Sequence, residues 1–308
     1  MIRRFAALMP LWVVALGIVG YLYPPPLVWF KPYLEWMFFG TMLGIGCTMQ
    51  FSDFRPLVRH PHLVLLGLLA QFIIMPGCGF LIAKALHFPP ELFLGMILVG
   101  VVPGAMASNV VSYLARTDVA YSIALTSTAT LLSPILTPAL TYLYAGTVIH
   151  IDSWAMCLSI LKIVLLPLLI GFSLKHFCPK PVERIHDVFP ALSALCIAII
   201  CGMVVALNQS RIASLSLVIF LAIFTHNLLG YSGGYVAGKL FRFDRRRRRT
   251  LAIEVGMQNA GLGAVLAIAH FSPETALIPA IFATWCVITA SLLARYWSRQ
   301  VPQEVDGN

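Results

Sequence analysis

Side chains that could bind a cation are concentrated in one decapeptide of an otherwise apolar sequence. The segment EVGMQNAGLG, at 254–263, places Glu254, Gln258 and Asn259 between long hydrophobic runs. The other eleven acidic residues lie at the ends of such runs, between them or in the C-terminal tail. A charge at the centre of a membrane costs about 2.5–3.5 kcal/mol on insertion scales, so a membrane-buried Glu254 needs a partner or a function.

Further oxygen-bearing side chains lie inside earlier apolar runs. They are Gln71, Ser108, Asn109, Ser122 and Thr126. Ser122 and Thr126 are four residues apart and therefore share one face of a helix. A single hydroxyl of this kind usually bonds a carbonyl of the preceding turn. Taken together with the decapeptide, however, they form a set of hard oxygen ligands without His or Cys, and one carboxylate among neutral oxygens favours a monovalent cation.

The composition requires that these side chains be held by membrane helices. Of 308 residues, 59% are hydrophobic and 11% are charged, and the mean hydropathy is +0.88. Soluble domains carry about 25% charged residues. The apolar runs are long and continuous, which is typical of spanning helices and not of a β-barrel. The net charge of +9 does not indicate nucleic-acid binding, because the basic residues lie at the ends of the runs.

Ten apolar spans are predicted, with both termini in the cytoplasm. They are 5–22, 31–50, 61–86, 92–115, 119–144, 153–176, 188–208, 212–240, 249–270 and 275–298. Seventeen Lys and Arg residues lie at one set of span ends and three at the other, which gives the orientation. The RRRRR run at 245–249 is chiefly this topology signal, and binding of anionic lipid headgroups is a secondary interpretation.

Two spans carry polar, glycine-containing interruptions, PGAMASN at 103–109 and EVGMQNAG at 254–261. Ten spans divide into five plus five of opposite orientation, the geometry of an inverted repeat, and these interruptions fall in the fourth and ninth spans. An unwound helix offers carbonyls to a cation and half-helix N-termini to an anion. The repeat Gly230, Gly234, Gly238 predicts close helix packing in the eighth span.

The segments ASNVVSYLARTDVAYSIALTSTATLLSPILTP, at 107–138, and EVGMQNAGLG carry a resemblance to a known family. Over essentially its full length the chain resembles bacterial members of the bile acid:sodium symporter family, homologues of the apical sodium-dependent bile acid transporter. The resemblance implies an all-α polytopic membrane protein whose fourth and ninth helices are discontinuous and cross. Its panel domain would be 1–60 (helices 1–2) and 150–210 (helices 6–7), and its core 61–145 (helices 3–5) and 211–299 (helices 8–10), with a cytoplasmic tail at 300–308.

The same resemblance implies two sodium sites and a substrate site. The first sodium site falls on Ser108, Asn109, Ser122, Thr126 and Glu254. The second falls on Gln71, Glu254, Gln258 and the backbone carbonyls of Val255 and Met257. The residues expected to contact substrate are Asn259, Thr289, Met106 and Asn109. Ile288 and Thr289 align where bile-acid-binding relatives carry a His-Asn pair, and Met106 replaces a Thr of some relatives, so the anion stays open between a bile acid and a small carboxylate such as pantoate.

These observations predict a sodium-coupled symporter of the bacterial inner membrane that imports an organic anion by alternating access, with membrane lipid as its other partner. The alternative is a proton-coupled organic anion transporter in which Glu254 carries the proton. A membrane enzyme is excluded by the lack of an HExxH motif, of paired intramembrane aspartates and of a nucleophile near a base. The oligomeric state and the roles of Lys162 and His226 are left open.

Overall fold

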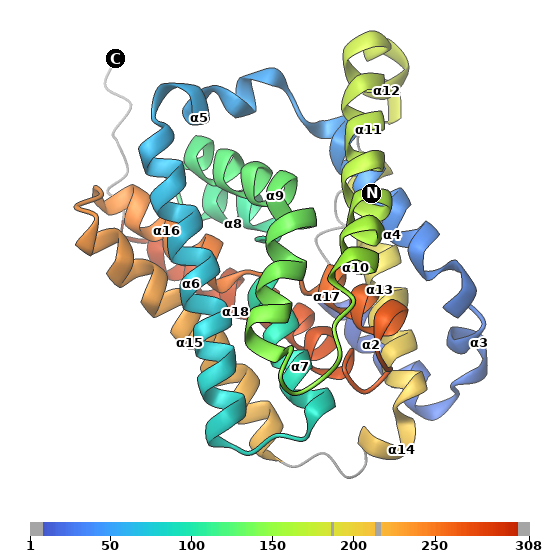
Figure 1. Cartoon of the computed structure of the whole chain (residues 1–308). Coiled ribbons are helices and arrows are strands. Elements are labelled where there is room, and N and C mark those ends of the chain that lie inside the picture. Colours follow the sequence, from blue (N-terminus) through green and yellow to red (C-terminus); the bar gives the residue numbers. More distant parts are fainter. Residues whose placement is uncertain (1–8, 186–187, 213–216, 301–308) are drawn as a thin grey trace.

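The computed structural model describes residues 9–185, 188–212 and 217–300, and within them the chain is helical without any extended strand (Figure 1). The first half contains α2 (Met9–Leu22), α3 (Pro25–Val28), η1 (Lys31–Tyr33), α4 (Leu34–Thr48), η2 (Phe51–Phe54), α5 (Arg55–Arg59), α6 (Pro61–Ala85), α7 (Pro90–Val101), α8 (Ala107–Leu114) and α9 (Val119–Ala145). The second half contains α10 (Ser153–Ile160), η3 (Leu161–Leu165), α11 (Leu166–Phe177), α12 (Pro179–Ile185), α13 (Val188–Leu207), α14 (Gln209–Ile212), α15 (Leu217–Leu240), α16 (Arg245–Gly256), α17 (Ala260–His270) and α18 (Leu277–Ser298).

Six helical segments in the described part of the chain are long and apolar enough to cross a membrane. They are α6, α9, the continuous α10–α11 segment, α13, α15 and α18. A seventh is obtained if α2 and the Pro25–Thr48 segment are counted as one span, although the chain bends by 111° between them. The remaining predicted spans are not counted because their helices are short, as in α7 and α17. The ten-span inverted repeat therefore stays a prediction.

Both predicted interruptions break their helices. The chain leaves α7 at Val101, and Val102 is extended with ψ 155°, as expected for a residue that precedes proline. The second break follows Gly256, where Met257 takes an extended ψ of 102°. The helix resumes at Ala260. The sequence pattern thus located both breaks correctly.

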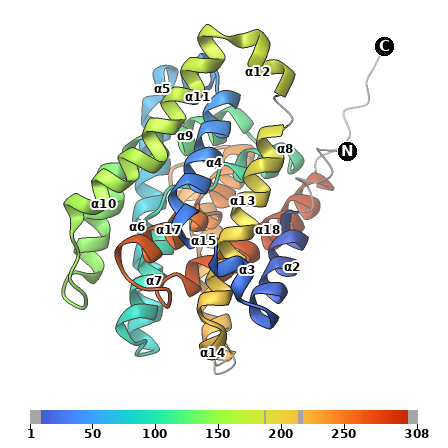
Figure 2. The same ribbon diagram turned by 90° about the vertical axis from the view of Figure 1, so that its right-hand side faces the viewer.

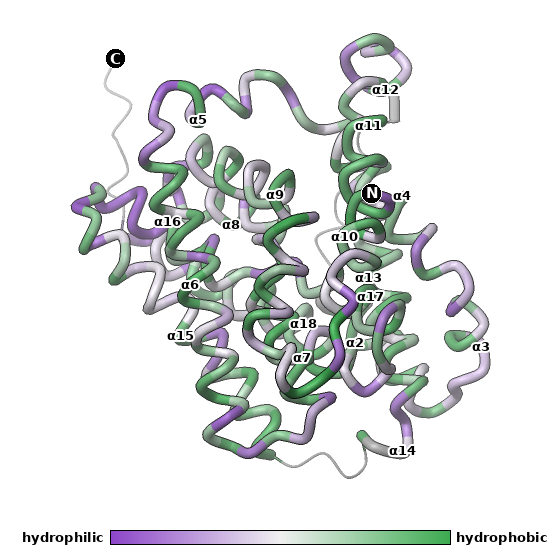
Figure 3. The backbone as a smooth tube through the Cα atoms, viewed as in Figure 1, coloured by the Kyte–Doolittle hydropathy of each residue, from purple (hydrophilic) through white to green (hydrophobic). Residues whose placement is uncertain are grey.

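The helix α16 begins four residues before the predicted span start at 249. Its N-cap is Asp244, whose carboxylate accepts hydrogen bonds from the backbone N–H groups of Arg246 and Arg247. Arginine is a good helix former, so the five-arginine run forms the first turn and a half of α16. Hydrophilic residues gather there and around α5 in Figure 3.

Close helix contacts fix the position of α16. The repeat that begins at Gly230 packs α15 against it, since a Cβ at Gly234 would lie 2.7 Å from the carbonyl oxygen of Leu251. Figure 1 shows α2, α4 and α13 on one side of the molecule and α6, α15 and α16 on the other, and Figure 2 shows the first of these groups from its own side. The division into panel and core stays a prediction.

Candidate functional site

The side chain of Glu254 is fully buried near the end of α16. Among the described residues it takes part in no ion pair, so its partners are neutral. A buried carboxylate without a counter-ion is costly unless its oxygens are hydrogen-bonded or coordinate a cation. The local geometry shows how its oxygens are satisfied.

Three hydroxyl groups surround this carboxylate. The Ser122 hydroxyl lies 2.5 Å from Oε1 of Glu254, and the Thr126 hydroxyl lies 2.6 Å from Oε2. The Ser108 hydroxyl, from the first turn of α8, also donates to Oε1. Asn109 completes the group, because its Oδ1 lies 2.9 Å from the Ser122 hydroxyl. All five residues predicted for the first cation site therefore come together.

The residues predicted for a second site include two buried side-chain amides, those of Gln71 and Gln258. Gln71 is fully buried in α6, and neither polar atom of its amide has a hydrogen-bond partner. The side-chain oxygen of Gln258 is likewise buried and unpaired, whereas its nitrogen donates to Val255 O at 2.8 Å. Buried amide oxygens without donors are uncommon. They are the groups that a bound cation would satisfy.

Gly104 lies close to both the Glu254 carboxylate and the Gln71 amide. A Cβ added there would be 3.1 Å from Glu254 Oε2 and 3.6 Å from Gln71 Nε2. The carboxylate and the Gln71 amide therefore face a common space that only a residue without a side chain leaves open. The surrounding oxygens include one carboxylate and no His or Cys, which fits a hard monovalent cation.

The two helix breaks are joined by backbone hydrogen bonds. Gly104 and Gln258 form an isolated antiparallel bridge. On either side of it, Ala105 N–H donates to Met257 O at 2.9 Å, and Asn259 N–H donates to Pro103 O at 2.8 Å. The bridge holds the broken segments side by side, so α8 and α17 begin three and two residues after it, at Ala107 and Ala260.

The expected substrate contacts are only partly assembled. Asn259 is half-buried and caps α17, because its Oδ1 accepts the N–H of Leu262 at 3.2 Å. Met106 stands at the corresponding position before α8 and is also half-buried. Thr289 contacts α15 instead, with its hydroxyl 2.8 Å from Asn227 Oδ1. The structure therefore places Asn259, Met106 and Asn109 at the helix breaks. Thr289 is connected to the second break through Asn227, which its hydroxyl contacts.

Asn227 and His226 make interhelical hydrogen bonds from α15. The Asn227 amide nitrogen donates to Gly256 O at 2.9 Å, which satisfies the last carbonyl of α16. The imidazole of His226 lies 2.9 Å from Met75 O of α6. Lys162, in contrast, is 69% exposed and lies 3.8 Å from a Glu35 oxygen. None of these three side chains contacts Glu254.

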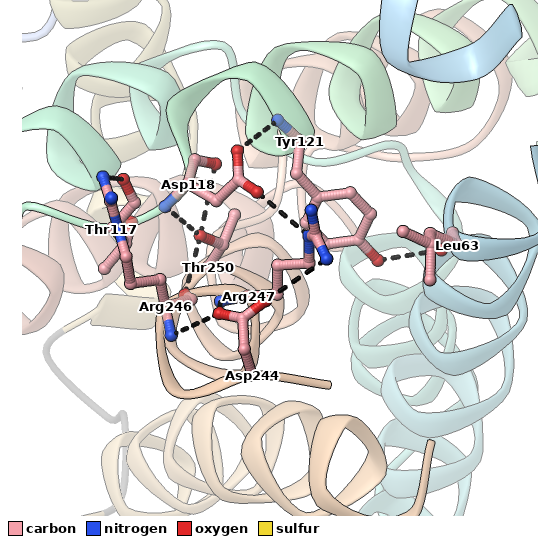
Figure 4. Close-up of polar contacts among 8 residues, drawn as sticks. All are labelled: Leu63, Thr117, Asp118, Tyr121, Asp244, Arg246, Arg247 and Thr250. Atoms are coloured by element: carbon pink, nitrogen blue, oxygen red, sulfur yellow. Dashed lines mark hydrogen bonds and ion pairs between the residues drawn. The ribbon is translucent and has the colours of Figure 1, made fainter. Parts of the chain in front are cut away.

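A second set of contacts between α9 and α16 lies one helical turn from the carboxylate and was not predicted from the sequence (Figure 4). The backbone N–H of Asp118 donates to the Thr250 hydroxyl at 2.9 Å. The two residues precede Ser122 and Glu254 by four positions each, so they lie on the same helix faces. The four-residue spacing predicts this contact only when it is already known that α9 packs against α16.

Comparison with known proteins gives a consistent result. Residues 36–215 match the family described as the Sodium Bile acid symporter family. An uncharacterized sodium-dependent transporter of Bacillus subtilis (strain 168), YocS, is 40% identical over 97% of this chain and 93% of its own length. A probable sodium/metabolite cotransporter of Arabidopsis thaliana, chloroplastic BASS1, is 35% identical over 96% of this chain and 75% of its own length.

Proposed function

Because this chain belongs to the sodium bile acid symporter family, we propose that it is a secondary active symporter that imports an organic anion together with sodium ions. The family consists of sodium-dependent transporters, so the chain is a carrier and not an enzyme. The observation that supports this proposal best is the buried carboxylate of Glu254, which is surrounded by neutral oxygens and has no counter-ion among the described residues.

One sodium ion binds on the hydroxyl side of the carboxylate. Its ligands are Ser108, Asn109, Ser122, Thr126 and Glu254. The hydroxyl groups now donate to the carboxylate; when the ion enters, they rotate and offer lone pairs to it instead, which a hydroxyl can do because it is both donor and acceptor. The ion neutralises the buried charge and links α8, α9 and α16.

A second sodium ion binds on the amide side, between Gln71, Glu254, Gln258 and the carbonyl groups of Val255 and Met257. The unpaired oxygens of the two glutamines support this assignment. Met257 O also accepts a hydrogen bond from the backbone N–H of Ala105, so this ion contacts one of the groups that join the two helix breaks. Sodium binding thereby organises the region where the anion binds.

The organic anion binds beside the paired breaks, where the N-terminal dipoles of α8 and α17 favour negative charge. Asn259 uses its oxygen as the cap and presents its amide nitrogen to a carboxylate. Met106 and Asn109 provide the neighbouring surface, and Thr289 acts through Asn227. The substrate is a bile acid or a small carboxylate such as pantoate.

Transport follows by alternating access of a core against a panel in a ten-span inverted repeat. Both termini face the cytoplasm, and the protein resides in the bacterial inner membrane. Two sodium ions with one monovalent anion carry one net charge inward, which contributes about 2.3 kcal/mol per 100 mV of membrane potential.

Uptake into proteoliposomes tests the proposal. The full chain is reconstituted, and uptake of taurocholate and of pantoate is measured with Na⁺ or K⁺ outside. We expect Na⁺ to stimulate uptake of at least one anion, and Glu254→Gln to abolish that stimulation because it removes the charge but keeps the shape. Glu91→Gln, at the first turn of α7, is the matched control and should transport normally.

Two outcomes would overturn the proposal. Uptake that is equal in Na⁺ and K⁺ would exclude sodium coupling. Uptake driven by a pH gradient without Na⁺, and lost in Glu254→Gln, would instead show the proton-coupled alternative. A thermal unfolding series in Na⁺ and K⁺ gives an independent readout, since an ion that binds only the folded state raises its stability by about 2.7 kcal/mol at 100 times its Kd.

A further inference from the structure

A pocket of about 250 Å³ lies at the arginine-rich end of the molecule, between α5, α6, α9 and α16. Its polar lining consists of Ser52, Arg55, Arg59, His60, Asp118 and Arg247. The cation site described above includes none of these residues. The lining contains three guanidinium groups and one carboxylate, so these four groups together carry an excess of two positive charges.

The three arginines differ in whether a nearby carboxylate already neutralises their charge. Arg247 donates to Asp118 Oδ2 at 3.1 Å and also lies 3.3 Å from Asp244 Oδ2 (Figure 4). Arg55 and Arg59 are exposed and take part in no ion pair among the described residues. The pocket thus has two uncompensated guanidinium groups on one wall and a fixed one on the other.

From this arrangement we infer that the pocket binds a phosphate-bearing anion, either a lipid headgroup or free phosphate. A guanidinium group matches phosphate oxygens with two parallel hydrogen bonds, and such charge-assisted bonds are about twice as strong as neutral ones. The hydroxyl of Ser52 and the ring of His60 supply further donors at the rim. A phosphate group offers more acceptor oxygens than the two of a carboxylate, so it can form more hydrogen bonds to the two walls at once.

The apolar part of the lining is compatible with either source. Leu63, Val64 and Tyr121 belong to this apolar lining, and the Tyr121 hydroxyl donates to Leu63 O at 3.0 Å. The glycerol region of a lipid would contact these apolar side chains, whereas with free phosphate bound they would stay in contact with water. Under the proposed topology the pocket faces the cytoplasmic leaflet; the charge arrangement itself does not depend on that orientation.

An occupied pocket would connect elements that carry the cation ligands. Two of its four walls come from the start of α9 and from α16, and Asp118 and Arg247 precede Ser122 and Glu254 by one and two helical turns. A phosphate held between Arg59 and Arg247 therefore links α5 to α16. The measurable consequence is a saturable rise in the thermal stability of the folded protein.

Charge-matched variants distinguish a pocket from general attraction of anions to basic residues. Arg55→Gln/Arg59→Gln removes two exposed charges inside the pocket. Arg295→Gln/Arg299→Gln removes two exposed charges from α18 and the residue after it, at the same end of the molecule but outside the pocket. A third variant, Arg55→Lys/Arg59→Lys, keeps the charge and removes the two-pronged geometry.

The first arm of the test uses inorganic phosphate. The full chain is placed in nanodiscs of phosphatidylcholine, and its unfolding temperature is titrated with phosphate, acetate or chloride at constant ionic strength. We expect a saturable stabilisation by phosphate that acetate does not reproduce. Its apparent affinity should fall at least about tenfold in the pocket variant and stay unchanged in the α18 variant, with the lysine variant in between.

The second arm uses lipid. The same proteins are taken from vesicles that contain phosphatidylglycerol and phosphatidylcholine, and retained lipids are counted by native mass spectrometry. Selective loss of one bound phosphatidylglycerol in the pocket variant would identify the lipid as the source, even if free phosphate has no effect. If neither probe distinguishes the pocket variant from the α18 variant, the inference is wrong and the arginines attract anions only as a diffuse charge.

Discussion

Adding one methyl group at Gly104 should weaken sodium binding without unfolding the protein. The Cβ of Gly104→Ala would lie 3.1 Å from Glu254 Oε2, so the carboxylate must move by a few tenths of an ångström. Gly104 does not have a positive φ, so the change imposes no backbone strain. The effect is therefore steric and acts on the space shared by the carboxylate and the Gln71 amide.

The magnitude follows from the cost of overpacking. Extra methylene groups in a packed interior cost about 1–3 kcal/mol, and 1.4 kcal/mol corresponds to a tenfold change in affinity. We expect the Na⁺ concentration for half-maximal uptake to rise about tenfold. Gly77→Ala is the matched control, because no atom lies within 4 Å of a Cβ at that position of α6.

Two measurements together test this reasoning. Na⁺ titration of anion uptake gives the half-saturating concentration, and Na⁺-dependent thermal unfolding gives ion affinity without transport. The expected pattern is a shift in both for Gly104→Ala and in neither for Gly77→Ala. Normal Na⁺ dependence in Gly104→Ala would refute the claim that the Gly104 space belongs to a cation site.

Three further substitutions test single contacts. Thr126→Val should weaken Na⁺ affinity about tenfold in uptake titrations, whereas Thr130→Val should not, because the Thr130 hydroxyl bonds only the Thr126 carbonyl, at 2.8 Å. Asn259→Ala should lower stability by about 1 kcal/mol through loss of the α17 cap, and Asn259→Asp should keep the cap yet weaken anion uptake; equal unfolding temperatures for both variants would contradict the capping role. Thr250→Val should cost about 1–3 kcal/mol in thermal unfolding, because the Asp118 N–H loses its acceptor; an unchanged unfolding temperature would show that water replaces the hydroxyl.

The sequence was sufficient to find the residues around Glu254. A single carboxylate in an apolar run and hydroxyls spaced by four residues are local signals, and the structure places Ser122 and Thr126 against that carboxylate. The positions of the helix breaks were also predictable, because the residue before Pro103 is disfavoured in a helix and glycines weaken the neighbouring turns.

The partners of individual side chains were not predictable, because they depend on the register between distant helices. Nothing local to Thr289 reveals that its hydroxyl is directed to Asn227. The pairing of Gly104 with Gln258 joins residues from different halves of the chain. Arg246 and Arg247 were interpreted as a topology signal, yet they also bond Thr117 O and the Asp118 carboxylate at the start of α9.

The carboxylate of Glu254 and the hydroxyls around it enter the membrane at different times during synthesis. Ser108, Ser122 and Thr126 precede Glu254 by 146, 132 and 128 residues. Until Glu254 emerges from the ribosome, these hydroxyls must be satisfied locally, and the Thr126 hydroxyl lies 3.0 Å from Ser122 O, one turn earlier in its own helix. The first half can therefore insert without a sodium site, and ion binding becomes a property of the finished chain.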